Sequence, residues 1–155
     1  MAEPRPILLV CTGNTCRSPM AEALLREALH RRGLSEHFTV ASAGTAAIPG
    51  AAATDGAIEA MDALGLSLTD HRSSPLTYDA VNAAWLILTM TRDHKLAVIN
   101  RYPEAADRVY TLGEFAGEPF GRDWEVADPF GGSAKVYAAT AAELERVVQH
   151  IADYL

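Results

Sequence analysis

The N-terminal segment constrains the fold most, because a short apolar run leads into a polar loop and then into a helical pattern. Residues 7–10 (ILLV) are continuously apolar and follow Pro6. Such a run, bounded by turn residues, is typical of a parallel strand buried on both faces. Residues 11–18 (CTGNTCRS) are predicted to form a loop, and residues 20–32 carry apolar side chains at helical spacing. We expect Ser18 to be the N-cap of this helix and Pro19 its first residue.

The same alternation of strands and helices continues to the C-terminus. Further strands are predicted at residues 38–42, 85–90 and 109–112, with Trp85 in the core. Helices are predicted at residues 54–64, 78–83, 92–100 and from a cap at Ser133 to residue 154, whereas residues 45–53 and 114–132 are expected to be irregular. The pattern indicates a single α/β domain over residues 1–155, with a four-stranded parallel sheet flanked by helices on both faces.

Composition excludes several classes of protein. The net charge of −7 disfavours sequence-independent binding to nucleic acid or to an anionic membrane. Only two cysteines are present, close together, and the five histidines are scattered, which argues against a disulfide framework and a four-ligand zinc site. No apolar run approaches the ~20 residues needed to span a bilayer, and the N-terminus does not resemble a signal peptide. We therefore expect a cytoplasmic protein.

The first loop is predicted to bind an anion. It lies where the carboxyl end of a parallel strand meets the positive end of a helix, a place where open α/β sheets bind ligands. Gly13 and Asn14 tolerate the backbone conformations of a tight turn, so that successive N–H groups can converge on one oxyanion. Arg17 adds a planar fork of donors that matches two phosphate oxygens. The loop is therefore expected to be a phosphate-binding loop between the first strand and the first helix.

The residues around this loop also supply the parts of a nucleophilic mechanism. Cys11 lies at a helix N-terminus beside an arginine, which favours the nucleophilic thiolate, and Ser18 can donate a hydrogen bond to its sulfur. Asp128 is a candidate general acid; Pro129 restricts it to extended conformations, and glycines follow at positions 131 and 132. The expected product is a phosphocysteine that water then hydrolyses. The loop lacks the lysine of a nucleotide-binding P-loop, and no metal or other cofactor is expected.

Some residues have two interpretations on sequence grounds alone. Cys16 is either a small packed side chain or a redox partner, and Asp128 is either an acid or an ordinary turn residue. His71 and His94 are interpreted as surface or structural residues. Trp124 lies in irregular chain and cannot be placed.

Three motifs together resemble the low-molecular-weight protein phosphatases. Residues 10–22 (VCTGNTCRSPMAE) match that family's N-terminal motif, residues 42–44 (SAG) match its motif after the second strand, and residues 128–130 (DPF) match its acid loop. The resemblance extends over nearly the whole chain. It implies a metal-independent phosphatase in which Cys11 is the nucleophile, Arg17 binds phosphate and Asp128 is the general acid.

The resemblance also implies roles for the neighbouring side chains. Asn14, Ser18 and Ser42 are similar to residues that brace the loop, and Cys16 resembles a second cysteine that forms a reversible disulfide with Cys11. Backbone N–H groups are expected to bind phosphate along the whole loop, at Thr12, Gly13, Asn14, Thr15, Cys16, Arg17 and Ser18.

Two positions bear on the substrate. Thr15 and the Phe130 loop (DPFGG) resemble the bacterial protein arginine phosphatases, whereas tyrosine-directed members usually carry Ile or Leu at the first position and Tyr at the second. We therefore predict phosphorylated proteins as substrates, most of all phosphoarginine, with inorganic phosphate as product. A tyrosine phosphatase of the same family is the alternative. An arsenate reductase is disfavoured because it needs further cysteines, and a non-catalytic anion-binding protein is disfavoured because Cys11, Arg17 and Asp128 are all present.

Overall fold

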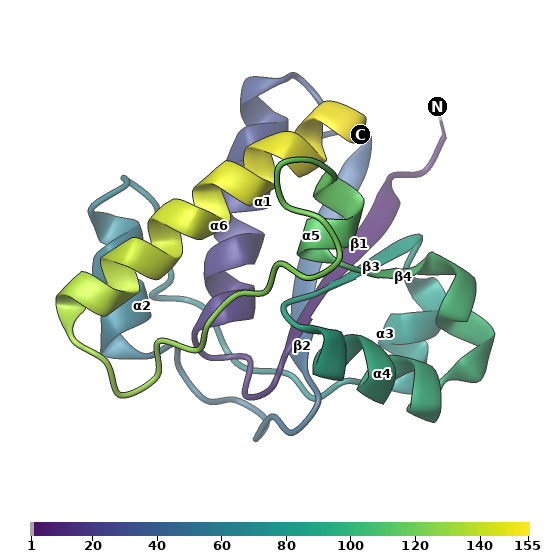
Figure 1. Cartoon of the computed structure of the whole chain (residues 1–155), viewed down its shortest axis with the longest axis horizontal. Coiled ribbons are helices and arrows are strands. Elements are labelled where there is room, and N and C mark those ends of the chain that lie inside the picture. Colours follow the sequence, from purple (N-terminus) through teal and green to yellow (C-terminus); the bar gives the residue numbers. More distant parts are fainter. Residues whose placement is uncertain (1) are drawn as a thin grey trace.

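A four-stranded, all-parallel sheet in the order β2-β1-β3-β4 forms the centre of the computed structural model, which describes residues 2–155 (Figure 1). The strands are β1 (Arg5–Cys11), β2 (Phe38–Gly44), β3 (Leu86–Thr89) and β4 (Val109–Thr111). The predicted four-stranded parallel sheet is confirmed. Because the chain crosses from β2 over β1 to β3, the carboxyl end of β1 lies between those of β2 and β3.

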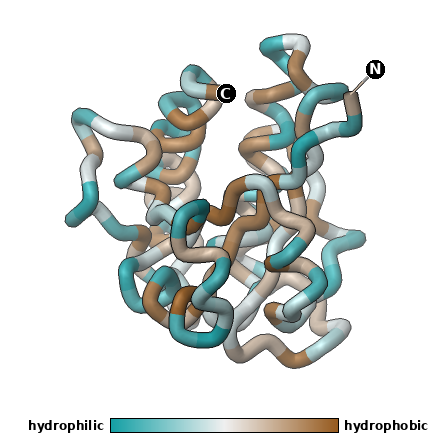
Figure 2. Tube along the Cα trace, turned by 90° about the vertical axis from the view of Figure 1, so that its right-hand side faces the viewer, coloured by the Kyte–Doolittle hydropathy of each residue, from teal (hydrophilic) through white to brown (hydrophobic). Residues whose placement is uncertain are grey.

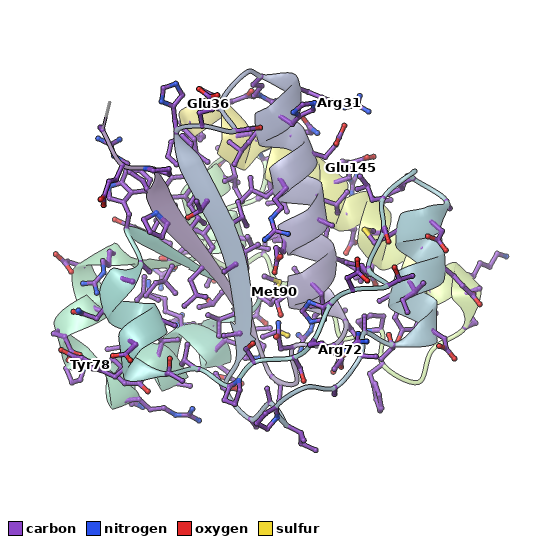
Figure 3. All side chains as sticks on the ribbon, turned by 180° about the vertical axis from the view of Figure 1, so that it is seen from behind. Arg31, Glu36, Arg72, Tyr78, Met90 and Glu145 are labelled. Atoms are coloured by element: carbon purple, nitrogen blue, oxygen red, sulfur yellow. The ribbon has the colours of Figure 1, made fainter. Side chains whose placement is uncertain are left out.

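Helices cover both faces of this sheet, as predicted (Figures 1 and 3). In chain order the helices are α1 (Arg17–Arg31), α2 (Asp55–Asp62), α3 (Tyr78–Ala83), α4 (Arg92–Arg101), the 3-10 helix η1 (Pro103–Arg108), α5 (Leu112–Ala116) and α6 (Ala134–Tyr154). On one face α1 and α6 pack together, with α5 beside them and α2 against both; α3 and α4 lie on the opposite face.

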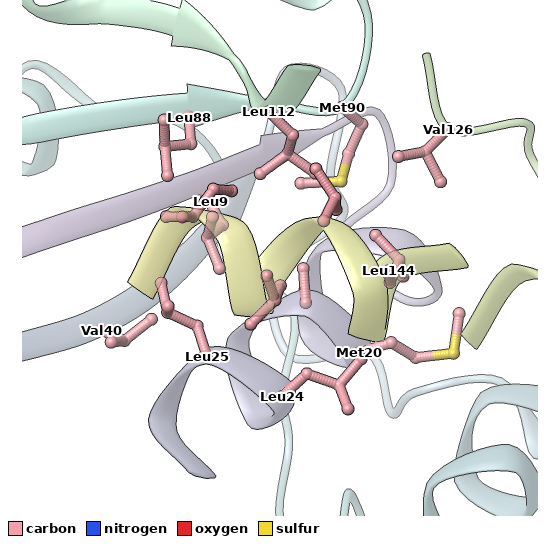
Figure 4. Packing of buried hydrophobic residues seen from close by; sticks show 14 of the residues in the cluster. Leu9, Met20, Leu24, Leu25, Val40, Leu88, Met90, Leu112, Val126 and Leu144 are labelled. Atoms are coloured by element: carbon pink, nitrogen blue, oxygen red, sulfur yellow. The ribbon is translucent and has the colours of Figure 1, made fainter. Parts of the chain in front are cut away.

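Successive residues of β1 enter different apolar clusters, one on each side of the sheet. Ile7 and Leu9 join the cluster beneath α1 and α6, and Leu8 and Val10 join the cluster beneath α3 and α4. A strand covered on both faces needs an unbroken apolar run, which is what residues 7–10 supply. Figure 4 shows Leu9 among side chains from α1, α6 and the neighbouring strands, and Figure 2 shows the hydrophobic stretches gathered inside the trace. Met90, just after β3, also lies inside the molecule, whereas Arg31, Glu36 and Glu145 lie at its periphery (Figure 3).

The long helix α6 closes one layer with a single apolar stripe. Its buried side chains recur every three or four positions, at Tyr137, Ala141, Leu144, Val148 and Ile151. The helix begins where the sequence predicts, because the Ser133 side chain accepts a hydrogen bond from the backbone N–H of Val136. Within residues 2–155, no helix combines the length and the apolar character needed to cross a membrane.

Three local predictions were wrong. The N-cap position of α1 is Cys16 rather than Ser18, because the Ser18 hydroxyl is engaged with the loop instead of with the helix backbone. Residues 112–116, assigned to the end of a strand and to irregular chain, form α5, which Thr111 and Glu114 start with a capping box. Trp85 is 41% exposed rather than buried, since it precedes β3 and packs its ring against Phe38 at the end of the sheet.

Candidate active site

Asn14 determines the shape of the loop between β1 and α1. Its backbone is left-handed, with φ of 58°, a conformation that Asn tolerates better than most residues. The side-chain amide donates to the hydroxyls of Ser18 (2.8 Å) and Ser42 (2.9 Å), and its oxygen accepts from the backbone N–H of Ser74 (2.8 Å). The fully buried Asn14 therefore ties the loop to the end of β2 and to the segment before α3.

Two further residues that the sequence does not predict for the site support this arrangement, one by contacting Asn14 and the other by contacting its partner Ser42. The Nε2 of His71 lies 2.7 Å from the carbonyl oxygen of Asn14, and Glu22 Oε1 accepts a hydrogen bond from the Ser42 hydroxyl at 2.6 Å. Glu22, on α1, belongs to the N-terminal motif, but its partner Ser42 lies on β2. His71 lies 57 residues along the chain from Asn14, so only the fold brings the two together.

Gly44, at the carboxyl end of β2, allows the loop to pack closely against the sheet. A Cβ atom at this position would collide with the carbonyl oxygen of Thr12 and lie 3.0 Å from the backbone nitrogen of Asn14. The chain after Gly44 then donates backbone hydrogen bonds from Thr45 to the carbonyl of Cys11 (2.9 Å) and from Ala46 to that of Thr12 (3.0 Å). Steric exclusion therefore explains the glycine of the SAG motif, because no side chain fits at this position.

The sulfur of Cys11 lies at the base of the loop. It is 2.8 Å from the Ser18 hydroxyl and 3.3 Å from the backbone nitrogen of Asn14. Since the Ser18 oxygen accepts from the Asn14 amide, its own hydrogen is left to point at the sulfur. The first backbone N–H groups of α1 lie beside the sulfur, and no earlier helical turn supplies them with acceptors. The arrangement favours negative charge, on the sulfur and on an anion above it.

Arg17 links the loop to the segment that carries Asp128. Its guanidinium is almost fully buried; Nη1 donates to the carbonyl oxygen of Val126 at 3.1 Å, and Nη2 lies 3.6 Å from Asp128 Oδ2. Val126 is itself fixed to the end of β3 by a backbone hydrogen bond to Met90. The Asp128 side chain remains 53% exposed, so it faces both the arginine and the solvent from which a substrate arrives.

A cavity of about 170 Å³ brings these elements together. It is lined by Cys11, Thr12, Gly13, Thr15, Cys16, Arg17, Asp128 and Phe130. Asn14 and Ser18 do not line it, because their side chains lie behind the loop and hold it in place. Larger hollows of about 550 and 490 Å³ lie between α1 and β2, but no residue of the loop lines them. Within residues 2–155, no group of three or more His, Cys, Asp or Glu side chains is arranged to hold a metal ion.

Cys16 sits in a buried contact with α6 that sequence reasoning missed. Its sulfur lies 3.4 Å from the hydroxyl of Thr54 and 3.5 Å from that of Tyr137, and Thr54 donates to Tyr137 at 3.1 Å. Burial, followed by the hydrogen bond to Cys16, raises the pKa of the Tyr137 phenol above its usual value. Both cysteines are free thiols. The contact gives Cys16 a packing role, and the redox role stays a prediction.

Replacing Asn14 by alanine is expected to destabilise the protein by about 2–4 kcal/mol, since it puts a non-preferred residue in the left-handed region and leaves buried partners unpaired. The shift of the urea unfolding midpoint at unchanged slope measures the effect. Asn82→Ala, at an exposed position of α3, is the matched control and should change stability by less than about 0.5 kcal/mol. Equal stabilities of the two variants would contradict the bracing role of Asn14.

Comparisons with known proteins agree with this geometry. Residues 6–155 match the family described as low molecular weight phosphotyrosine protein phosphatase. The chain is 43% identical to a protein-arginine-phosphatase of Bacillus subtilis over 149 residues, covering 96% of this chain and 95% of the relative. It is 38% identical to a probable low molecular weight protein-tyrosine-phosphatase, EpsP, of Ralstonia solanacearum over 144 residues, covering 93% and 91%.

Among solved structures, the chain is similar to the YwlE arginine phosphatase in a cysteine-to-serine mutant form with a phosphorylated active-site serine. That likeness has a TM-score of 0.90 at 42% identity and covers 97% of this chain and 95% of the other. The sequence match, the parallel sheet and the braced loop at the end of β1 all lead to one assignment. The chain belongs to the low molecular weight phosphotyrosine protein phosphatases, a family of cysteine-dependent hydrolases.

Proposed function

We propose that Cys11 is the nucleophile of a two-step phosphatase reaction. The observation that carries this is one small cavity walled by Cys11, Arg17 and Asp128. In the first step the sulfur attacks phosphorus, the bond from phosphorus to the leaving nitrogen or oxygen breaks, and Asp128 gives its proton to the leaving atom. In the second step water attacks the phosphocysteine, returns a proton to Asp128 and releases inorganic phosphate. Arg17 and the loop N–H groups hold the phosphoryl oxygens throughout.

We propose phosphoarginine on proteins as the substrate. A relative 43% identical over 96% of the chain is named a protein-arginine-phosphatase. Thr15 lines the cavity with a hydroxyl, a polar group that an aliphatic side chain would lack. The half-exposed Asp128 can attract a guanidinium in its ionised form, and in its protonated form it can give a proton to the leaving nitrogen. Phe130, 71% exposed beside Asp128, offers a flat face on which a guanidinium can stack.

Phosphotyrosine is the second candidate substrate. A relative 38% identical to this chain is named a probable protein-tyrosine-phosphatase, and the face of Phe130 would also stack on a phenol ring. Two features of the chain favour phosphoarginine over phosphotyrosine. Thr15 contributes a polar group to the cavity, and residues 45–49, in the loop after Gly44, carry no aromatic side chain that could stack on a phenol ring.

The test is a comparison of kcat/KM for two peptides of one sequence, phosphorylated on arginine in one and on tyrosine in the other. We expect the phosphoarginine peptide to be preferred. A tenfold or greater preference for phosphotyrosine, about 1.4 kcal/mol of differential transition-state stabilisation, would rule out the arginine assignment.

Thr15→Ile is expected to shift the ratio of the two kcat/KM values toward phosphotyrosine by about tenfold or more, since it removes a polar contact and adds apolar surface. The ratio is measured with the same two peptides. Thr39→Ile, at an exposed position of β2, is the matched control and should leave the ratio unchanged. An unchanged ratio in Thr15→Ile would remove this residue from the specificity determinants.

We also propose a cytoplasmic location. The mechanism needs Cys11 as a free thiol, both cysteines are free in the structure, and the cytosol keeps thiols reduced. Phosphorylated intracellular proteins would then be the partners.

A further inference from the structure

His94, on α4, contacts the cavity wall although no sequence motif assigns it to the site. Its imidazole is buried, with 7% of the residue exposed, and both ring nitrogens face hydroxyls. Nε2 lies 2.8 Å from Thr12 Oγ1, and Nδ1 lies 2.9 Å from Thr91 Oγ1. Thr12 in turn lines the cavity beside Cys11 and Asp128. A buried imidazole therefore connects the start of α4 with the phosphate-binding loop.

The start of α4 sets the direction of these hydrogen bonds. Thr91 is the N-cap of α4, and its oxygen already accepts from the backbone N–H of His94 at 3.3 Å. Its hydroxyl hydrogen is then free to point at Nδ1. A neutral imidazole that accepts at Nδ1 carries its proton on Nε2 and donates from there. Thr12 Oγ1 receives that hydrogen bond, so the hydrogen of the Thr12 hydroxyl is left for an acceptor in the cavity.

We propose that His94 is a positioning residue: in its Nε2-protonated form it fixes the Thr12 hydroxyl as a hydrogen-bond donor to the phosphoryl group in the cavity. This inference rests on the proposed phosphatase function. A donor held in place before the reaction stabilises the charge that develops on phosphoryl oxygens without reorganising during the step. Thr12 thus becomes a side-chain contact in a cradle otherwise made of backbone N–H groups and Arg17.

The electrostatics around His94 favour the neutral ring that this arrangement needs. Burial, followed by the nearby Arg17 guanidinium, lowers the pKa of His94 from 6.5 to about 4, and the carboxylates of Asp93, Glu125 and Asp128 oppose the shift only partly. At neutral pH the imidazole is therefore uncharged in the folded protein. A protonated ring would have hydrogens on both nitrogens and could not accept from Thr91.

The first test reads the proton position directly, by nitrogen NMR of the histidine side chains in the full-length protein at pH 7. His94→Gln identifies the His94 signals by their loss. We expect a protonated Nε2 and an unprotonated Nδ1. A proton on Nδ1, or on both nitrogens, would overturn the proposal. Since this readout needs no turnover, it is independent of the phosphatase mechanism, which Cys11→Ser tests separately.

The second test is a double-mutant cycle on kcat with the phosphorylated peptide. Thr12→Val and His94→Leu should each lower kcat about tenfold with little change in KM, and the double variant should be no slower than the slower single variant. Thr12→Ser and His94→Gln keep a hydroxyl and an amide donor, and both should restore most of the lost rate. A double variant slower by about the product of the single effects would show that His94 acts independently of Thr12, and would overturn the proposal. A Thr12→Val enzyme with the full wild-type rate would overturn it as well, and since Thr12 is exposed this variant is expected to fold.

Discussion

Cys11→Ser is expected to abolish multiple turnover, with a loss in kcat of at least about 10⁴-fold, because a serine hydroxyl is not ionised near neutral pH and removing a nucleophile costs this much in comparable enzymes. The oxygen can keep the hydrogen bond to Ser18, which joins the two side chains at 2.8 Å in the structure. The cradle should therefore stay intact. Phosphate release from the peptide over many turnovers is the measurement.

Phosphate affinity separates loss of chemistry from loss of the site. We expect the Cys11→Ser protein to bind inorganic phosphate about as tightly as the wild type in calorimetry, since Arg17 and the loop N–H groups remain. A single slow transfer onto the new hydroxyl is compatible with the mechanism, as a related structure carries a phosphorylated active-site serine. Wild-type turnover in this variant would refute Cys11 as the nucleophile.

Asp128→Asn is expected to lower kcat by about 10²–10⁴-fold on the phosphorylated peptide, the range that general acid catalysis contributes. The amide cannot give a proton to the leaving nitrogen or to a tyrosine oxygen. With p-nitrophenyl phosphate, whose leaving group departs without a proton, the loss should be much smaller. The two substrates measured side by side distinguish an acid from a residue that only binds.

The control for this variant comes from the same stretch of chain. Asp123→Asn removes an exposed carboxylate between α5 and Asp128 and should leave both rates within about twofold, since isolated surface charges contribute little. Equal losses on the two substrates in Asp128→Asn would mean that this residue contributes to binding rather than to proton transfer.

The parts of the site that could be predicted from the sequence are those that lie in a motif, the loop at residues 11–18 and the acid loop at residues 128–130. Residues 7–10 predict β1, residues 11–18 predict the loop, and Cys11, Arg17 and Asp128 do line one cavity in the structure. The four-stranded parallel sheet also follows from the alternation of apolar runs and helical patterns, because each strand buried on both faces carries its own signal.

Three residues that support the loop from distant parts of the chain could not be found in this way. His71, His94 and Tyr137 lie 57, 82 and 121 residues from the loop atoms that they contact, and a scattered polar residue carries no periodic signal. The α5 helix, in contrast, could have been predicted, since Thr111 and Glu114 have the spacing of a capping box in the sequence. The apolar pattern around Trp85 predicts a core position, because such a pattern does not reveal that the strand begins one residue later, at Leu86.

The bracing of Asn14 has a consequence for ligand affinity. Two separate parts of the chain hold this one residue in its left-handed conformation: Ser42 on β2, and the segment before α3 that carries His71 and Ser74. The conformational entropy of the loop is therefore lost when the protein folds and not when an anion arrives. A small oxyanion can bind such a preorganised site tightly without contacts elsewhere. The phosphoryl group is then bound in the same way in every phosphorylated side chain. Selectivity among substrates comes from the surface around the cavity, which contacts the leaving group.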